Sequence, residues 1–196
     1  MLNRSTQSSD PTPNTHTGLQ LALAHPSNAA YLARPCQYQL TTQPCPSKYW
    51  LESRFAEEVI AEMDIAISRI KSQLAAKWLN IVGYSGGAAV AALITARRDD
   101  IIRLVTIAGN LDHKTWTQHH IVPPLLGSLN PMQVRDKLKD LPQWHFVGGR
   151  DIIIPSSLAV SFSRNFSHSE IVSFPKYTHN CCWIEKWPQI WRKITK

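Results

Sequence analysis

Residues 83–87, Gly-Tyr-Ser-Gly-Gly, constrain the fold of this chain more than any other segment. They fit the pattern Gly-x-Ser-x-Gly, a sharp turn that lifts a nucleophilic serine out of a strand and leads into a helix. Upstream, 79–82 is an apolar stretch of strand length, and downstream 88–96 is a run of small residues with high helix propensity. Glycines are favoured beside such a turn because the incoming helix leaves little room for side chains. The segment therefore predicts a strand, a tight turn carrying Ser85, and a helix.

Other segments alternate between strand and helix patterns. Apolar stretches of strand length lie at 101–108, 144–147 and 171–174. Helical patterns lie at 51–78, 156–165 and 182–193. In the first of these, one apolar stripe recurs at steps of three to four and is expected in the core: Phe55, Val59, Ile60, Met63, Ile67, Ile70 and Leu74. The alternation predicts an α/β fold, with a mostly parallel sheet flanked by helices.

The length of 196 residues fits a single domain, which we place at 18–196. Residues 1–17 are rich in Ser, Thr, Pro and Asn and are predicted to form a flexible leader. One or two helical turns are expected at 19–24 and a buried strand at 29–38. Residues 111–142 have no sustained period and are expected to form a loop or cap excursion over the substrate.

Composition excludes several classes of protein. Hydrophobic residues make up 43% and charged residues 18% of the chain, which argues against disorder. The net charge of +7 is spread along the chain without a nucleic-acid-binding motif, so no nucleic-acid partner is expected. No segment has the roughly 18 apolar residues of a membrane span, and the N-terminus lacks the apolar core of a signal peptide. The sequence as written predicts a cytoplasmic protein with a small-molecule partner, and it does not specify an oligomeric state.

Asp151 and His179, which both follow Ser85 in the sequence, complete a candidate catalytic triad. A serine hydroxyl needs a histidine to take its proton and an acid to orient that histidine. Asp151 follows the strand at 144–147 and a Gly-Gly turn, and His179 follows the strand at 171–174. The carboxyl ends of parallel strands meet at one edge of a sheet, so we expect the three side chains to lie together there.

Asp112 and three histidines offer alternatives. Asp112 also follows a strand and is a reserve candidate for the acid. His113, His119 and His120 suggest a metal site, but no carboxylate or cysteine joins them at ligand spacing. We interpret them as surface or pocket residues, and the sequence predicts neither a metal nor a cofactor.

Four cysteines leave the redox state open. Cys36 and Cys45 are nine positions apart, and Cys181 and Cys182 are adjacent, so none has the Cys-x-x-Cys spacing of a zinc or redox site. Free buried thiols and disulfides are equally compatible with this arrangement. Disulfides would indicate an oxidising compartment.

The chain resembles the α/β-hydrolases in three segments: 83–87, Gly-Gly-Arg-Asp-Ile-Ile-Ile-Pro at 148–155 and Thr-His-Asn-Cys-Cys-Trp at 178–183. It is most similar to a bacterial group of uncharacterised hydrolases, with shared motifs at 10–13, 32–38 and 108–112. The resemblance runs from about residue 10 to 191. It implies a serine hydrolase for an ester-like acyl bond, in which the backbone N–H of Gly86 stabilises the oxyanion. A thioesterase or an acyltransferase would use the same residues.

The front of the chain departs from this superfamily. Its members have several strands and a Gly-rich loop before the nucleophile, and that loop donates a second N–H to the oxyanion. Here Gly18 and Gly83 are the only glycines before Ser85. We expect that the N-terminus is shortened. The alternative to a serine hydrolase is a catalytically impaired or inactive fragment with a binding role. Members of the group often carry an export signal, so a lost front would move the expected location to the periplasm or outside the cell.

Four residues are expected to bind the substrate. Tyr84 lies next to the nucleophile, and Trp116, Leu125 and Leu126 lie in the excursion. The last three are expected to line or cover an apolar acyl pocket.

Overall fold

The computed structural model describes residues 11–38 and 45–195. Its centre is a sheet of four parallel strands in the order β1-β2-β3-β4. The strands are β1 (Leu79–Tyr84), β2 (Ile101–Ile107), β3 (Gln143–Gly148) and β4 (Ser169–Phe174). Each strand predicted after residue 78 is present within a few residues of its expected position, which confirms the α/β fold class.

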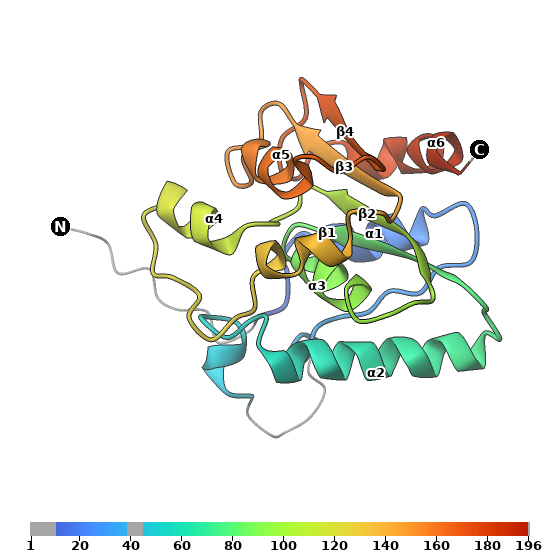
Figure 1. Ribbon diagram of the computed structural model, residues 1–196, viewed down its shortest axis with the longest axis horizontal. Helices are drawn as coiled ribbons and strands as arrows, with labels where there is room; N and C mark the ends of the chain where they lie inside the picture. The colour runs from blue at the N-terminus through green and yellow to red at the C-terminus, as the bar shows by residue number, and fades with distance from the viewer. Residues whose placement is uncertain (1–10, 39–44, 196) are drawn as a thin grey trace.

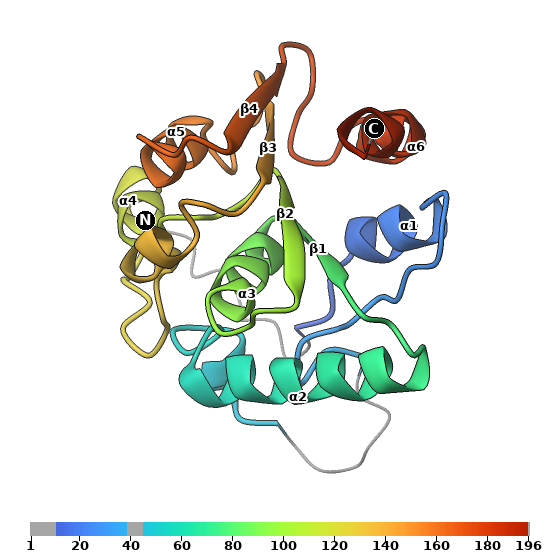
Figure 2. The ribbon, with the colours of Figure 1, turned by 45° about the vertical axis from the view of Figure 1, so that its right-hand side comes forward.

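Helices cover both faces of the sheet (Figures 1 and 2). Figure 2 shows α1 (Thr17–Leu23) and α6 (Trp183–Ile194) on one side of the strands. On the other side lie α3 (Gly86–Thr95), α4 (His113–His119) and α5 (Ser157–Ser163). The long helix α2 (Glu57–Gln73) packs against α3. Short 3-10 helices lie at Ser47–Tyr49, Pro131–Gln133 and Arg135–Lys137.

The apolar stripe predicted for the long helix forms part of the core. Val59, Ile60, Met63 and Ile67 are buried against α3, as predicted from their spacing. Leu74 is an exception, with 59% of its surface exposed, because α2 ends at Gln73. On the opposite face, the buried tryptophans of α6 pack against α1 and the inner strands.

The strand predicted over 29–38 does not form. A strand needs a hydrogen-bonding partner, and this segment pairs with none of the described strands. Its end is also turned, because Cys36 and Tyr38 have positive φ angles of 74° and 56°. The helical turns predicted at 19–24 are confirmed as α1. Most of the leader predicted at 1–17 lies outside the described residues, although Thr17 is buried as the first residue of α1.

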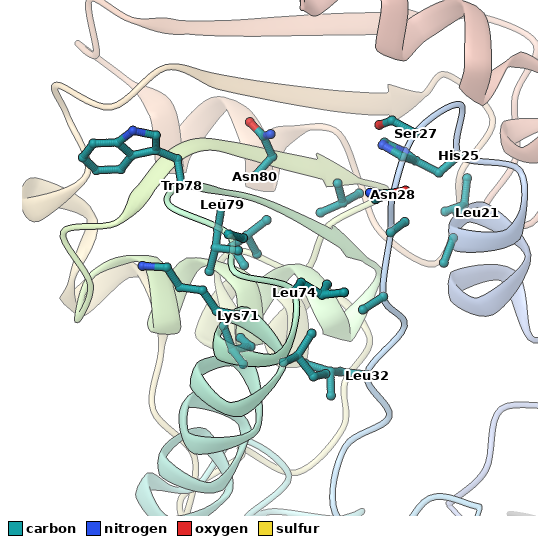
Figure 3. A pocket seen from close by; sticks show the side chains of 18 of the residues that line it. Leu21, His25, Ser27, Asn28, Leu32, Lys71, Leu74, Trp78, Leu79 and Asn80 are labelled. Carbon is teal, nitrogen blue, oxygen red and sulfur yellow. The ribbon is translucent and has the colours of Figure 1, made fainter.

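The nucleophile-bearing strand β1 lies at an edge of the sheet. Within the described residues it pairs only with β2, and its outer edge faces a cleft of about 400 Å³. Figure 3 shows this cleft between the end of α2, β1 and the extended segment that contains Ser27, Asn28 and Leu32. The cleft separates that segment from the edge of β1, which explains why the segment does not join the sheet.

The cysteines pair in the structure, Cys36 with Cys45 and Cys181 with Cys182. The predicted excursion at 111–142 contains α4 and two of the 3-10 helices rather than a continuous loop.

Among the described residues no helix is both long and apolar enough to cross a membrane.

Two buried histidines predict an acid-sensitive fold. Burial lowers the pKa of His145 to about 4, and burial with the nearby charge of Arg54 lowers the pKa of His113 to about 4. Between pH 7 and 5 the unfolded chain binds protons on these histidines, with a pKa near 6.5, whereas the folded chain does not. We therefore expect the free energy of unfolding to decrease as the pH is lowered from 7 to 5. The decrease is up to about 1.4 kcal/mol per pH unit for each histidine.

Urea unfolding at pH 7, 6 and 5 measures this dependence. Replacement of His145 by leucine should make the slope shallower, although it removes the hydrogen bond between His145 and Thr106. A slope equal to that of the unmodified chain would contradict the assignment to His145.

Candidate active site

Ser85 stands at the turn between β1 and α3 in a strained backbone conformation. Its φ and ψ are 53° and −122°, values that a residue with a side chain rarely adopts. Two backbone hydrogen bonds hold the turn on β2: Ser85 N donates to the Ile107 carbonyl at 2.9 Å, and Asn110 N donates to the Ser85 carbonyl at 3.1 Å. The turn therefore presents Ser85 at the carboxyl edge of the sheet.

The glycines around Ser85 differ in what they do. A Cβ on Gly83 would lie 2.5 Å from the Ala88 Cα, so the crossing of α3 over β1 requires glycine there. A Cβ on Gly86 would lie 3.3 Å from the Cζ of Phe55, which is a tight contact. A Cβ on Gly87 would meet nothing within 4 Å. The steric argument from the motif thus holds for Gly83 and does not hold for Gly87.

Asp151 and His179 lie beside Ser85. His179 Nε2 is 3.0 Å from Ser85 Oγ, and His179 Nδ1 is 2.9 Å from Asp151 Oδ2. An ionised carboxylate only accepts hydrogen bonds, so Nδ1 carries the proton and Nε2 is left to accept the serine hydroxyl. The Asp151 side chain is fully buried, whereas the His179 side chain keeps 14% of its surface exposed. The arrangement has the geometry of a serine nucleophile, a base and an orienting acid.

The loops that carry Asp151 and His179 fit closely against each other. Asp151 Oδ1 accepts hydrogen bonds from the backbone N–H groups of Ile153 and Ile154, at 2.9 and 2.8 Å. A Cβ on Gly148 would lie 2.6 Å from the Tyr177 carbonyl oxygen, so glycine allows the histidine loop to approach the acid loop. The Gly-Gly turn before Asp151 therefore allows the loops that carry Asp151 and His179 to pack closely enough for these side chains to form a hydrogen bond.

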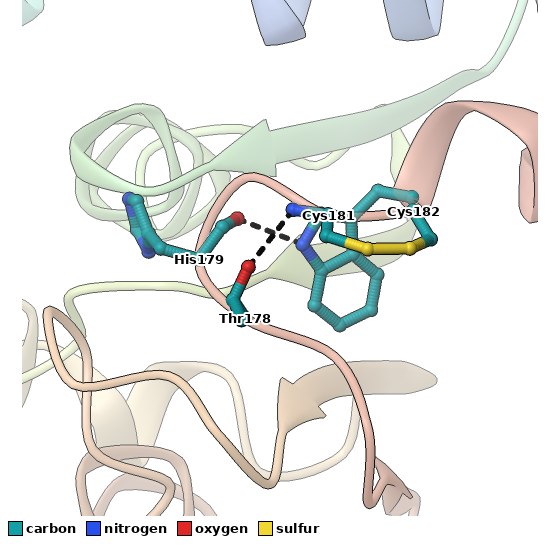
Figure 4. The surroundings of a disulfide bond; sticks show 5 residues. Thr178, His179, Cys181 and Cys182 are labelled. Atoms are coloured by element: carbon teal, nitrogen blue, oxygen red, sulfur yellow. Dashed lines mark hydrogen bonds between the residues drawn. A yellow bond between two sulfur atoms is a disulfide. The ribbon is translucent and has the colours of Figure 1, made fainter.

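Tyr84 and Trp183 hold the backbone of His179. The Tyr84 hydroxyl lies 3.0 Å from the His179 carbonyl and 2.8 Å from Asn180 Oδ1, and Trp183 Nε1 donates to the same carbonyl at 2.9 Å. Figure 4 shows His179, two residues before Cys181, beside the Cys181–Cys182 disulfide, with the Cys181 N–H donating to Thr178 Oγ1. Burial raises the pKa of Tyr84 to about 12, so it stays a hydroxyl donor at neutral pH.

Replacement of Tyr84 by phenylalanine should lower kcat about three- to tenfold with a smaller change in KM, because the histidine loop loses the single hydrogen bond that the hydroxyl shares between the His179 carbonyl and Asn180 Oδ1. Steady-state kinetics on a p-nitrophenyl ester measure the effect. Tyr49→Phe is the matched control, since the Tyr49 hydroxyl donates to Glu58 away from the site. Equal kinetics for the two variants would show that the Tyr84 hydroxyl does not position His179.

Asp112 lies apart from His179 and caps α4. Its Oδ1 accepts from the backbone N–H groups of Lys114 and Thr115, and its Oδ2 accepts from the Thr115 hydroxyl at 2.7 Å. The side-chain amide of Asn130 donates to it as well. The reserve acid therefore has the partners of a helix cap rather than those of a catalytic acid.

The expected pocket residues separate into two groups. Tyr84 and Trp116 line a cavity of about 430 Å³ that contains Ser85 and His179. Leu125 and Leu126 line a different cavity, next to α4, and Leu126 is 86% exposed. They do not line the Ser85 cavity because this segment is held on residues 52–55, where Leu129 N donates to the Phe55 carbonyl and Ser128 Oγ donates to the Glu52 carbonyl.

Arg34, Arg54 and Asn110 also line the Ser85 cavity, and pattern analysis missed them. Arg34 and Arg54 are distant in sequence from the triad candidates and belong to no strand or helix of the sheet. Asn110 follows β2 at the carboxyl edge and lies in the shared motif at 108–112, and these two signals point to it. Its Oδ1 is buried without a hydrogen-bond partner among the described residues.

Backbone N–H groups at the start of α3 follow directly after Ser85 in the chain. Gly86 and Gly87 occupy the first turn of this helix, where backbone N–H groups have no acceptor within the helix. Gly18, the other glycine before Ser85 besides Gly83, lies in α1 and lines the same cavity. No Gly-rich loop faces Ser85 from the described part of the chain.

The histidines of α4 do not form a metal site in the part of the chain that the structure describes, where no group of three metal-binding side chains occurs. His113 stacks on Phe55 with ring centroids 4.5 Å apart. His120 Nε2 lies 2.8 Å from the Ile153 carbonyl and contacts the ring of Trp116.

Solved structures share this fold at low sequence identity. An esterase from Pyrococcus furiosus matches with 15% identity and a TM-score of 0.58, over 72% of this chain and 60% of its own length. An α/β fold family hydrolase from Bacillus anthracis matches with 11% identity and a TM-score of 0.58, over 91% of this chain and 84% of its own. The esterase domain of a Rhodothermus marinus protein matches with 17% identity and a TM-score of 0.52, over 67% and 63%. The chain thus spans about three fifths of the length of the Pyrococcus esterase.

A family comparison gives the closer relationship. No curated protein matches the chain. The profile of the FSH1 serine hydrolase family matches residues 16–180, a range that includes Ser85, Asp151 and His179. Because this match spans most of the chain, the protein belongs to the FSH1 family of serine hydrolases.

Proposed function

We propose that the chain hydrolyses an ester-like acyl bond through Ser85, His179 and Asp151. The two hydrogen-bond distances that link these side chains, 3.0 Å and 2.9 Å, carry the proposal. Membership of a serine hydrolase family and a fold shared with esterases support it.

The reaction follows from the direction of these hydrogen bonds. Ser85 Oγ attacks the carbonyl carbon while His179 Nε2 takes the hydroxyl proton, and the Gly86 N–H stabilises the oxyanion. His179 then gives the proton to the leaving alcohol, and an acyl group stays on Ser85. Water, activated by the same nitrogen, releases the acid. Asp151 keeps the proton on Nδ1 and stabilises the imidazolium that forms at each step.

Incubation with a fluorophosphonate tests this proposal. We expect one covalent adduct on Ser85, located by peptide mass spectrometry, and release of p-nitrophenol from p-nitrophenyl esters. A panel of acyl chain lengths then measures how large an acyl group the cavity accepts. A folded sample without an adduct would exclude an active serine hydrolase and favour a binding role for the domain.

A further inference from the structure

The cavity beside Ser85 holds two arginine side chains that have no anionic partner within residues 11–38 and 45–195. Arg34 Nη1 donates to the carbonyl of Arg54 at 2.9 Å, and Arg54 Nε donates to the carbonyl of Leu51 at 2.7 Å. Neither guanidinium forms an ion pair with a described carboxylate. No Asp or Glu is among the described residues that line the cavity. This described lining therefore has two positive charges and no negative charge.

Arg98, which is also largely buried, differs from Arg34 and Arg54 in its hydrogen-bond partners. The Arg98 side chain is 11% exposed and contacts two carboxylates, Asp64 at 2.5 Å and Asp100 at 2.7 Å. In the part of the chain that the structure describes, the guanidinium groups of Arg34 and Arg54 have only backbone carbonyls as hydrogen-bond acceptors. Removing a charge from water without an opposite charge is costly, so the cavity favours an anion that enters from solution.

Both guanidinium groups are charged at neutral pH. Burial, together with the neighbouring charge of Arg54, lowers the pKa of Arg34 to about 10. Burial also lowers the pKa of Arg54, and the exposed Glu52 opposes that shift. The same proximity that lowers the pKa of Arg34 makes the two cations repel each other. A bound anion would relieve this repulsion.

The ring of Phe55 lies close both to Arg34 and to Gly86, the residue that follows the nucleophile. This ring is buried, and its Cζ would lie 3.3 Å from a Cβ on Gly86. The guanidinium carbon of Arg34 lies 5.4 Å from the centroid of the same ring. One aromatic ring thus separates Arg34 from the oxyanion donor, which is within the reach of a small substrate in a cavity of about 430 Å³.

We propose that the substrate of Ser85 carries an anionic group, such as a carboxylate, that Arg34 and Arg54 bind. Guanidinium groups recognise carboxylates through charge-assisted and often bidentate hydrogen bonds. This inference rests on the proposed hydrolase function and adds a substrate class to it. The anionic group belongs either to the acyl part or to the alcohol part of the ester, and kinetics distinguish the two.

Two matched pairs of esters test the inference. Mono-p-nitrophenyl glutarate and p-nitrophenyl valerate differ by a carboxylate at the end of the acyl chain. The acetate esters of 4-hydroxybenzoic acid and of its methyl ester differ by a carboxylate on the alcohol. We expect kcat/KM for the anionic member of one pair to exceed that of its neutral partner about 10- to 100-fold. The pair that responds identifies the part of the ester that carries the charge.

The dependence on salt and the effects of substitutions identify the side chains that bind the anionic group of the substrate. Increasing salt should raise KM for the preferred anionic ester more than for its neutral partner. Arg34→Gln and Arg54→Gln should each lower the anionic-to-neutral ratio of kcat/KM about tenfold, whereas Arg34→Lys retains part of it. Arg192→Gln is the control, because Arg192 is exposed on α6 and does not line the cavity.

The outcomes separate this inference from the proposed function. Equal kcat/KM within both pairs, or an equal loss on charged and neutral esters in Arg34→Gln, would overturn the anionic substrate even if the fluorophosphonate labels Ser85. Absence of both labelling and hydrolysis in a folded sample would overturn the hydrolase function, and this inference with it.

Discussion

Replacement of Ser85 by alanine is expected to lower kcat/KM for p-nitrophenyl esters about 10⁴-fold or more and to leave only the residual rate that substrate binding and the oxyanion donor supply. The change removes the atom that forms the acyl-enzyme, and neither His179 nor Asp151 replaces it. The fold should persist, because alanine keeps the backbone of the turn and the two hydrogen bonds that hold it to Ile107 and Asn110.

The measurement is a progress curve of p-nitrophenol release, with fluorophosphonate labelling of the same sample. Ser156→Ala is the matched control, since Ser156 is exposed and its side chain makes no capping hydrogen bond to α5. Hydrolysis by Ser85→Ala at the rate of this control would show that another nucleophile acts.

Replacement of Asp151 by asparagine has the second largest expected effect, a loss of about 10³- to 10⁴-fold in kcat. The side-chain amide would still accept from the N–H groups of Ile153 and Ile154. However, it would face His179 Nδ1 with an N–H, which favours the tautomer whose Nε2 is protonated. In that tautomer His179 cannot take the proton of Ser85.

Asp112→Asn separates the two candidate acids. Asp112 caps α4 through Lys114 and Thr115, and asparagine caps a helix about as well as aspartate, so this replacement should change the free energy of unfolding little and leave kcat within about threefold. Thermal unfolding and steady-state kinetics on both variants give the comparison. A loss of kcat in Asp112→Asn as large as in Asp151→Asn would assign the acid to Asp112.

Local pattern predicted the strands and the order of the candidate residues. The run 79–96 contains the strand, turn and helix in adjacent positions, so no distant contact was needed to recognise it. Asp151 and His179 are predictable in the same way, because each lies in the loop that follows a short strand. Parallel strands bring their carboxyl ends to one edge, which makes sequence order a good guide to position.

The first half of the chain was less predictable. Residues 29–38 have the composition of a strand, but whether an extended segment joins a sheet depends on a free edge beside it. In this fold a cleft lies between this segment and β1. Likewise, the apolar character of Leu125 and Leu126 predicted an acyl pocket at Ser85, whereas Leu125 packs against the core and Leu126 is exposed beside a different cavity.

The sequence by itself determined the α/β fold class, the family to which the chain belongs and the candidate nucleophile, acid and base, because these depend on residues next to each other or directly after strands. Only the tertiary structure brought Arg34 and Arg54 into the cavity of Ser85, since no local pattern links them to the triad candidates. It also assigned Asp112 to a helix cap and placed the Tyr84 hydroxyl on the backbone of His179. Contacts between segments far apart in the chain decide these points, and such contacts follow from packing rather than from periodicity.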